Sequence, residues 1–442
     1  MPIVRILALV TLLAVLSLPV WQSSKAAPSL KALRFGKLLD GAGQVLTNAV
    51  VVIENDRIRS VGTDAAAIPS GAEVIDLTRF TAIPGLIDAH THMTYYWDQA
   101  PGTRPWAQSS ERMSTMTVHL AQENARRTLE TGCTTVRDLG SAEYMDIALR
   151  ELINSGGMIG PRMFVSGYGL QKARTAPRIG RVYATGGQAS GRLAVMRVAL
   201  QQLEAGADVI KMYGSTGSGD DVTGNQTFSF EEMQAAVEIA HQLGKRIAIH
   251  SYGPAGARDA VRAGTDSLEH ATDMDDETIA ELARRKIFYV PTIDHNRYYA
   301  EYSGQFGYSA EAVKNLNAFI ERNLATARRA HRAGVRFAMG SDAVMTMFGQ
   351  NTRELGWFVK AGMTPAEALA TATTNGAALL GMEKSIGTLA PGYYADIVAV
   401  EGDPLADIEV VINKVRWVMK GGAVVVDKTS SAQPSASVKQ TR

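Results

Sequence analysis

The chain has 442 residues, of which 46% are hydrophobic and 20% are charged, and its formal net charge is +1. This composition indicates a globular protein with one large domain, or a large domain with a smaller one attached. The near-zero net charge excludes a strong electrostatic attraction to nucleic acid or to anionic membranes, so we expect no nucleic-acid partner. The single cysteine, Cys133, excludes an internal disulfide.

The first 26 residues have the organisation of a secretory signal peptide. Arg5 precedes an apolar stretch at 6–20, and the small residues Ser24 and Ala26 suit cleavage after Ala26. A membrane anchor is the alternative, but the apolar stretch is shorter than the roughly 20 residues that span a bilayer. We therefore predict a periplasmic or secreted protein with no stable membrane anchor after cleavage. At the other end, residues 427–442 predict a disordered tail.

Between the two ends, short β-type runs alternate with helical stretches such as 229–244, which is the pattern of parallel βα units. Eight such runs follow one another: 82–92, 134–140, 162–169, 208–214, 246–253, 267–273, 288–295 and 336–343. Eight strand–helix pairs predict an α/β fold of the (β/α)8 or TIM barrel type, here over residues 81–386.

Two flanking segments do not fit this alternation. Residues 31–80 and 387–426 are rich in β-type runs and turn residues and lack long helical stretches. We expect them to form one small β-sandwich domain that both ends of the chain build together.

Catalytic side chains of such a barrel lie at the C-terminal ends of its strands. Six potential ligands occupy these positions: His90, His92, Lys211, His250, His270 and Asp342. His90 and His92 are two residues apart on a strand, so both side chains leave the same face and can take adjacent places around one metal ion. Polar residues satisfied within a barrel core are the alternative, but they explain poorly why so many histidines gather at strand ends. The pattern therefore predicts a metal site.

Lys211 and Asp342 each raise a chemical question. Lys211 lies in the apolar run "ADVIKMYG", where a buried ammonium is costly unless it is paired, deprotonated or chemically changed. An ion pair with Asp342 or Glu269 is the structural alternative. Asp342 offers a carboxylate that can bind a metal ion and exchange a proton with water, or can simply cap a loop.

These motifs together resemble a known superfamily. The string "PGLIDAHTH", the lysine of the fourth strand, the histidines of the fifth and sixth, and "GSDA" of the eighth are similar to the binuclear-metal amidohydrolases, over about residues 31–426. The strings "TTVRDLGS", "ADVIKMYGS", "IAIHSYG" and "SLEHATD" resemble one branch of it. That branch holds the imidazolonepropionase-like metallo-dipeptidases that release C-terminal proline or arginine, and related bacterial amidohydrolases that hydrolyse ochratoxin A.

The resemblance implies a zinc centre and a reaction. It implies two Zn²⁺ per chain, bridged by a carboxylated Lys211. By the same resemblance, His90, His92 and Asp342 hold one ion, and His250 and His270 hold the other. The implied reaction is hydrolysis of the amide or peptide bond of N-acyl amino acids or dipeptides, ochratoxin A included, with Asp342 exchanging the proton. A cyclic-amide or imidazolone hydrolase or deaminase with the same metal centre is the alternative, as is a binding protein without turnover.

Three residues are predicted to contact substrate. Tyr252, two residues after His250, is a candidate to hydrogen-bond an oxyanion or a substrate carboxylate, with a packed tyrosine as the alternative. Arg137 can pair with a carboxylate, or instead with the neighbouring Asp138. His295 ends the seventh run and faces the same rim.

Specificity is expected to come from loops. Segments 93–106 and 345–348 bring aromatic residues and methionines near the rim, where they can line an apolar pocket. The glycine-rich stretch 214–224 lacks the ending of a phosphate-binding loop and is expected to cover the site instead. The sequence does not decide whether the protein forms a homo-oligomer.

Overall fold

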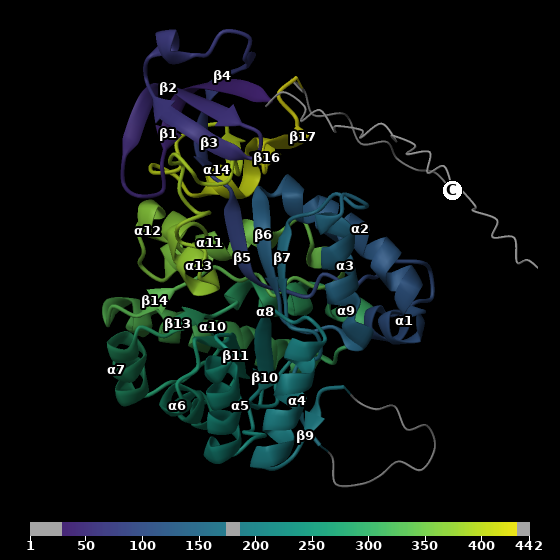
Figure 1. The fold of residues 1–442 in the computed structure, drawn as a ribbon. Helices are drawn as coiled ribbons and strands as arrows, with labels where there is room; N and C mark the ends of the chain where they lie inside the picture. Colours follow the sequence, from purple (N-terminus) through teal and green to yellow (C-terminus); the bar gives the residue numbers. More distant parts are fainter. Residues whose placement is uncertain (1–28, 174–185, 431–442) are drawn as a thin grey trace, which may run out of the picture.

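A computed structural model describes residues 29–173 and 186–430, and Figure 1 shows them as two parts. The upper part is a β-sheet domain, and the lower part is a set of strands surrounded by helices. The predicted signal peptide and residues 431–442 of the predicted tail lie outside the described residues. Within the described ranges, no helix combines the length and the apolar character needed to cross a membrane.

In the lower part, eight parallel strands form two sheets, and a separate two-stranded sheet consists of β8 (Gln171–Lys172) and β9 (Gln188–Ala189). The three-stranded sheet consists of β5 (Leu86–Thr91), β6 (Cys133–Asp138) and β7 (Arg162–Val165). The five-stranded sheet consists of β10 (Val209–Tyr213), β11 (Arg246–Ser251), β12 (Ser267–His270), β13 (Phe288–Val290) and β14 (Arg336–Phe337). Their order in space follows their order in the sequence, as in a (β/α)8 barrel.

Backbone hydrogen bonds join the two sheets at both edges. Beyond β7, Leu170 N donates to Lys211 O at 2.8 Å, and Tyr213 N donates to Leu170 O at 2.9 Å. At the opposite edge, beyond β14, Asp342 N donates to His90 O at 2.7 Å. The strands therefore close into a ring, and the predicted barrel is confirmed.

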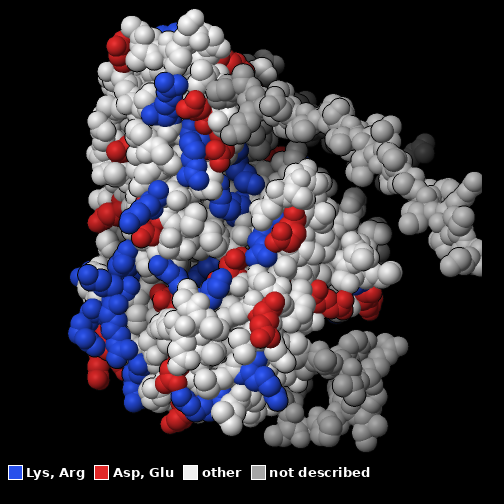
Figure 2. All heavy atoms as spheres, in the orientation of Figure 1, with Lys and Arg blue, Asp and Glu red and all other residues white. Residues whose placement is uncertain are grey.

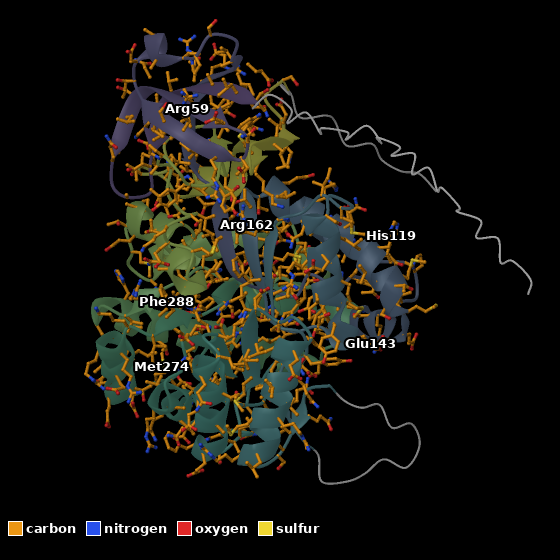
Figure 3. The ribbon with its side chains drawn as sticks, viewed as in Figure 1. Arg59, His119, Glu143, Arg162, Met274 and Phe288 are labelled. Atoms are coloured by element: carbon orange, nitrogen blue, oxygen red, sulfur yellow. The ribbon has the colours of Figure 1, made fainter. Side chains whose placement is uncertain are left out.

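Helices pack around the ring (Figure 1). They are α1 (Pro105–Glu111), α2 (Ser114–Glu130), α3 (Met145–Asn154), α4 (Arg192–Glu204), α5 (Phe230–Gln242), α6 (Pro254–Ala263), α7 (Asp276–Arg285), α8 (Ile293–Glu301), α9 (Ser303–Phe306), α10 (Ala310–Arg332), α11 (Glu354–Lys360), α12 (Pro365–Thr371) and α13 (Thr374–Leu380). Of these, α1 and α8 pack at the end of the ring that holds a cavity. The predicted helical stretch 229–244 is α5, which begins after Ser229 because Ser229 and Glu232 form a capping box. His119 lies exposed on the outer helix α2, away from the strands (Figure 3).

Both ends of the chain build one seven-stranded sheet, in the order β17-β16-β15-β4-β1-β2-β3. Its strands are β1 (Leu30–Leu39), β2 (Val45–Glu54), β3 (Arg57–Gly62), β4 (Glu73–Pro84), β15 (Ile397–Val400), β16 (Val415–Lys420) and β17 (Ala423–Asp427), and the short α14 (Glu409–Asn413) connects β15 to β16. The sheet folds over on itself. This is seen where Ile58 N of β3, at one edge, donates a hydrogen bond to Tyr393 O just before β15. Phe35 and Trp417 pack in the core between its layers. The predicted union of both ends is thus confirmed.

Strand β4 connects the two domains. It extends to Pro84, past the predicted limit at residue 80, and pairs with β1 on one edge and with β15 on the other. The next residue, Gly85, approaches β6 so closely that a Cβ would lie 2.2 Å from Thr134 Oγ1. Arg162 of β7, labelled in Figure 3, forms a partly buried ion pair at the same junction, with its Nη1 2.6 Å from Oδ2 of Asp396.

The seventh and eighth strands are shorter than predicted. β13 ends at Val290, and Thr292 adopts a left-handed conformation with φ of 48°. Helix α8 then begins at once, because the carboxylate of Glu354 accepts hydrogen bonds from Ile293 N and Asp294 N, both at 2.9 Å. His295 therefore belongs to the first turn of a helix and not to the end of a strand.

Candidate metal and catalytic site

A cavity of about 130 Å³ opens at the C-terminal ends of the barrel strands. Its lining includes all six predicted ligands, and the full set is His90, His92, Tyr95, Trp106, Lys211, Tyr213, Ser218, His250, Tyr252, His270, His295, Tyr299, Asp342 and Val344. The barrel therefore brings together side chains from five strands that are far apart in the sequence. This is the end of a (β/α)8 barrel at which chemistry is expected.

Strand alternation accounts for most of this convergence. His90 on β5, Lys211 on β10 and His250 on β11 point into the barrel because side chains alternate between the two faces of a strand. His270 and Asp342 reach the cavity differently, since both have left-handed backbones with φ of 71° and 52°. Such conformations cost energy for residues other than glycine and concentrate at functional sites.

Asp342 lies at the centre of the cluster. Its Oδ1 is 3.1 Å from His92 Nε2 and 3.5 Å from His90 Nε2, and its Oδ2 is 3.3 Å from His295 Nε2. One carboxylate thus faces three imidazole nitrogens at distances that allow it to share a metal ion or a proton with them.

Several donor atoms around Asp342 suit a metal ion. His90, His270 and Asp342 each offer one ligand atom, and these atoms all lie within 4.8 Å of one another. Nε2 of His250 is buried and has no hydrogen-bond partner among the described residues. Since a buried polar atom without a partner is costly, this nitrogen fits a role as a ligand.

The second ring nitrogen of three of these histidines is held by the protein. The contacts are His90 Nδ1 to Glu269 Oε2 at 2.8 Å, His92 Nδ1 to Gly140 O at 3.1 Å, and His270 Nδ1 to Thr292 Oγ1 at 2.7 Å. With Nδ1 engaged, Nε2 of each ring is left as the atom that faces the cavity. Metal-binding histidines are oriented in this way.

Burial keeps most of these bases neutral. It lowers the pKa of His90 and His270 well below 6.5, and that of His250 to about 3. Burial also lowers the pKa of Lys211 from 10.5 to about 8. Neutral imidazole carries the lone pair that a metal ion requires, and the lowered pKa of Lys211 increases the fraction of neutral amine that can react with an electrophile.

In Asp342 and His92, contacts with charged neighbours outweigh burial and favour the charged form of each group. Burial alone would raise the pKa of Asp342, but its contacts with His295 and His92 keep that pKa below 3.8. Burial alone would lower the pKa of His92, but its hydrogen bond to Asp342 raises that pKa. The cluster therefore contains one carboxylate that stays ionised and can accept a proton.

Lys211 does not form the ion pair that was the structural alternative for it. Its Nζ lies 3.3 Å from His90 Nε2, and within the described ranges no carboxylate of Asp342 or Glu269 pairs with it at 4.0 Å or less. The buried amine therefore faces the cluster without a direct anionic partner.

Arg137 is not where the sequence suggested. Its guanidinium is buried, does not line the cavity, and donates to Ala89 O at 2.6 Å, to Ser267 Oγ at 2.9 Å and to Glu269 Oε1 at 2.9 Å. These contacts replace both the predicted substrate contact and the alternative pairing with Asp138. The reason is that Arg137 points into the barrel interior, where partners from β12 are within reach.

Tyr252 and His295 do line the cavity, and their substrate contacts stay predictions. The Tyr252 ring stacks on His250 with centroids 5.1 Å apart, and its hydroxyl donates to Asn296 Oδ1 at 3.3 Å. His295 Nδ1 is buried without a hydrogen-bond partner in the described part of the chain. Both side chains therefore lie where a ligand in the cavity would contact them.

Aromatic residues form the walls, as predicted for segment 93–106, which contributes Tyr95 and Trp106. The ring of Tyr95 stacks on His92 with centroids 4.7 Å apart. Segment 345–348 differs, because Met345, Met347 and Phe348 are packed in the core behind the wall. Of the glycine-rich stretch 214–224, Ser218 reaches the cavity.

The sequence analysis missed two wall residues that simple spacing could have found. Tyr213 lies two residues after Lys211 on β10, so it faces the same side of the strand. Tyr299 lies four residues after His295 on α8, one helical turn along. Glu269 was considered only as a partner for Lys211, although it contacts His90.

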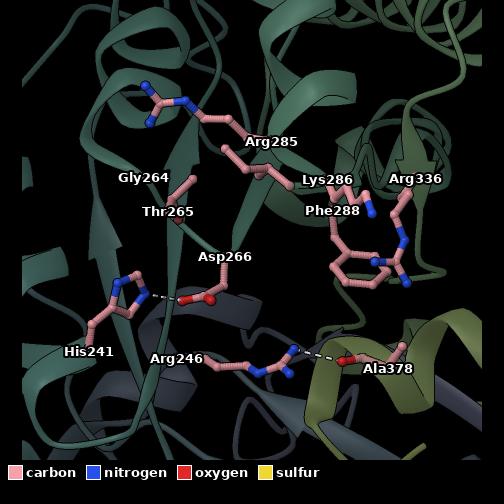
Figure 4. A pocket seen from close by; sticks show the side chains of 11 residues that line it. His241, Arg246, Gly264, Thr265, Asp266, Arg285, Lys286, Phe288, Arg336 and Ala378 are labelled. Carbon is pink, nitrogen blue, oxygen red and sulfur yellow. Dashed lines mark hydrogen bonds and ion pairs between the residues drawn. The ribbon is translucent and has the colours of Figure 1, made fainter.

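A larger cavity of about 420 Å³ lies at the N-terminal ends of β11, β13 and β14 (Figure 4). Lys and Arg gather on the surface beside α7 and β14 (Figure 2). Arg246 donates to Ala378 O at 2.7 Å at the end of α13, and Arg285 donates to Val261 O at 3.3 Å at the end of α6. Cations that satisfy helix carbonyls explain much of this charge, so we do not assign the reaction to this cavity.

Comparison with known proteins identifies relatives of this chain. A model described as the amidohydrolase family matches residues 81–425. The chain is 31% identical over 427 residues to ochratoxinase from Aspergillus niger, covering 88% of this chain and 85% of that protein. It is 25% identical over 456 residues to imidazolonepropionase from Symbiobacterium thermophilum, covering 88% and 97%. A crystal structure of a Xaa-Pro dipeptidase with bound methionine in the active site matches with a TM-score of 0.80 and 32% identity, covering 90% and 99%.

Proposed function

Because the chain belongs to the amidohydrolase family, we propose that it is a metal-dependent hydrolase of the amide bond in N-acyl amino acids or dipeptides, ochratoxin A included. The relatives named ochratoxinase and Xaa-Pro dipeptidase support this substrate class, since one name describes action on ochratoxin and the other describes cleavage of a dipeptide. The observation that carries the proposal is the placement of Asp342 among three imidazole nitrogens, beside a buried Lys211, at the catalytic end of the barrel.

The donor set supports a centre of two Zn²⁺ ions. His90, His92 and Asp342 would hold one ion, and His250 and His270 the other. The amine of Lys211, whose pKa burial lowers to about 8, would react with carbon dioxide and release a proton, and the resulting carbamate would bridge the ions. When bound, such a centre polarises the substrate carbonyl and makes water more acidic.

The side chains of the chain divide the remaining work. Asp342, ionised at neutral pH, would accept the proton of the attacking water and return it to the departing amine. The hydroxyl of Tyr252 would turn from Asn296 and donate to the developing oxyanion or to a substrate carboxylate. The rings of Tyr95, Trp106 and Tyr299 would pack against the acyl group.

Metal analysis tests the centre. Protein prepared without chelator should contain about two zinc ions per chain, because a bridging carbamate needs two cations to stabilise it. The measurement is elemental analysis of the purified protein alongside its hydrolytic rate. A single tightly held ion together with full activity would reject the two-ion centre while leaving amide hydrolysis in place.

A matched substrate panel tests the substrate class. We expect amidation of the free carboxylate of N-acyl-phenylalanine, Xaa-Pro or Xaa-Arg to lower kcat/KM by about 10- to 100-fold. The described lining contains no guanidinium, so hydroxyl donors such as Tyr252 and Ser218 would bind the carboxylate through charge-assisted hydrogen bonds of about 1.5–3 kcal/mol. The panel also includes cyclic ureides and imidazolones. The relative named imidazolonepropionase makes cyclic-amide hydrolysis the alternative function. Equal rates for free and amidated substrates would reject carboxylate binding and favour that alternative.

Export to the periplasm or the medium stays a prediction from the first 26 residues. A homo-oligomer stays open.

A further inference from the structure

We propose that Glu269 and Arg137 are positioning residues that orient His90 toward the metal centre, an inference that rests on the function proposed above. Neither residue lines the cavity, so neither is expected to touch substrate. Both are almost completely buried in the barrel interior, Glu269 at 0% and Arg137 at 2% exposure. They act through the ring and the backbone of β5.

The two carboxylate oxygens of Glu269 accept hydrogen bonds from different partners. Oε2 accepts the hydrogen bond from His90 Nδ1 at 2.8 Å. Oε1 accepts from Arg137 Nη2 at 2.9 Å and from the hydroxyl of Ser267. Because an ionised carboxylate only accepts hydrogen bonds, the proton of neutral His90 must lie on Nδ1, and the lone pair of Nε2 then points toward Asp342 and Lys211.

Arg137 fixes the carboxylate and the strand at once. Its Nε donates to Ala89 O at 2.6 Å, on the residue directly before His90, while Nη1 donates to Ser267 Oγ at 2.9 Å. One rigid guanidinium thus spans from β5 to β12 across the barrel interior. Only a planar fork with several donors can make these contacts together, which a lysine cannot do.

His90 differs from the other two oriented histidines in its partner. At Nδ1, His92 bonds to a backbone carbonyl and His270 to a hydroxyl, whereas the Nδ1 partner of His90 is a carboxylate. A carboxylate partner raises the basicity of a ligating imidazole as well as fixing its tautomer, and loss of such a partner typically weakens metal binding by about 10- to 100-fold. A structural ion pair alone would not require contact with a ligand ring.

The test compares Glu269→Gln with a control pair that lies away from the site. In the Gln variant one side of the amide is a donor, so it faces either Arg137 or His90, and His90 can then move its proton to Nε2 and block the lone pair. Asp396→Asn is the control, because it breaks the partly buried ion pair with Arg162 at the domain junction. Zinc affinity by chelator competition, the Tm of the metal-free protein, kcat and KM are measured for each.

We expect Glu269→Gln to bind zinc about 10- to 100-fold more weakly and to lower kcat at saturating zinc, with KM changed by less than about threefold. Asp396→Asn should lower Tm and keep the zinc affinity. Arg137→Lys provides a second route if the Gln variant does not fold, and it should weaken zinc binding too, because a lysine leaves Ala89 O or Glu269 without its donor.

Two results would overturn the inference. The first is that Glu269→Gln binds zinc within about twofold of the affinity of the parent. If the Gln variant does not fold, the same result in Arg137→Lys counts instead. The second is that Asp396→Asn loses as much zinc affinity as Glu269→Gln does. General destabilisation would then explain the weaker zinc binding of both variants. Absence of zinc binding by the parent protein is a separate outcome, since it would reject the proposed metal-dependent function and this inference with it.

Discussion

Replacement of Asp342 by Asn is expected to lower kcat by about 10³-fold while leaving the fold intact. The variant loses the ionised carboxylate that faces three imidazoles, so it loses both the proton acceptor and one ligand. The fold should survive because Asn has nearly the same shape and tolerates the left-handed backbone of residue 342, where φ is 52°. The measurement is kcat on an N-acyl amino acid at saturating zinc, together with Tm.

Asp294→Asn is the matched control for this variant. Asp294 is a buried carboxylate on α8 that accepts a hydrogen bond from Trp357 Nε1 at 2.9 Å and does not line the cavity. We expect its replacement to cost stability but not to lower kcat by more than a few fold. Near-normal kcat in Asp342→Asn at saturating zinc would show that another group accepts the proton.

Replacement of Lys211 by Met should abolish turnover and, at the same time, stabilise the metal-free protein at neutral pH. Burial lowers the pKa of Lys211 from 10.5 to about 8, so at about pH 7 folding buries a protonated amine at a cost of roughly 3 kcal/mol. Met fills similar space without a charge. The unfolded chain holds its lysine proton up to higher pH than the folded chain does, so the stability of the parent should rise between about pH 8 and pH 10.5.

Denaturant unfolding of both metal-free proteins at about pH 7 and about pH 10 measures this effect. The stability advantage of Lys211→Met should shrink as the pH rises across that window. Lys420→Met is the control for activity, because burial also lowers the pKa of Lys420 to about 8, but its Nζ donates to Gly160 O away from the cavity. Turnover should therefore persist in Lys420→Met. A Lys211→Met protein that still hydrolyses substrate would contradict the role given to the lysine.

Local sequence patterns were sufficient to predict which side chains converge on one cavity. Alternation along a strand gives His90 and His92 one face, and the rule that chemistry lies at the C-terminal ends of barrel strands brings Lys211, His250 and His270 to the same cavity. These arguments need only the position of each residue within its own strand. The β-rich composition of both chain ends likewise predicted their common domain.

Contacts between distant segments could not be predicted in this way. Arg137 stands at the end of a predicted strand like a rim residue, and only the packing of β5 and β6 against β12 shows that its partners are Ser267 and Glu269. His295 was assigned to a strand because nothing nearby indicates that Glu354 caps a helix at residue 293. In both cases, the position of the side chain depends on a contact with a residue that is remote in the sequence.

The position of β4 between β1 and β15 has a consequence for how the protein is made. β15 leaves the ribosome more than 300 residues after β4, so one edge of β4 stays unpaired while the barrel is being synthesised. Unpaired strand edges recruit other chains, and pairings of such long sequence separation form slowly. A nascent or truncated chain that lacks β15 would therefore expose an adhesive edge directly beside the barrel. We therefore expect completion of this sheet to be a late event in folding, after which β15 covers the exposed edge.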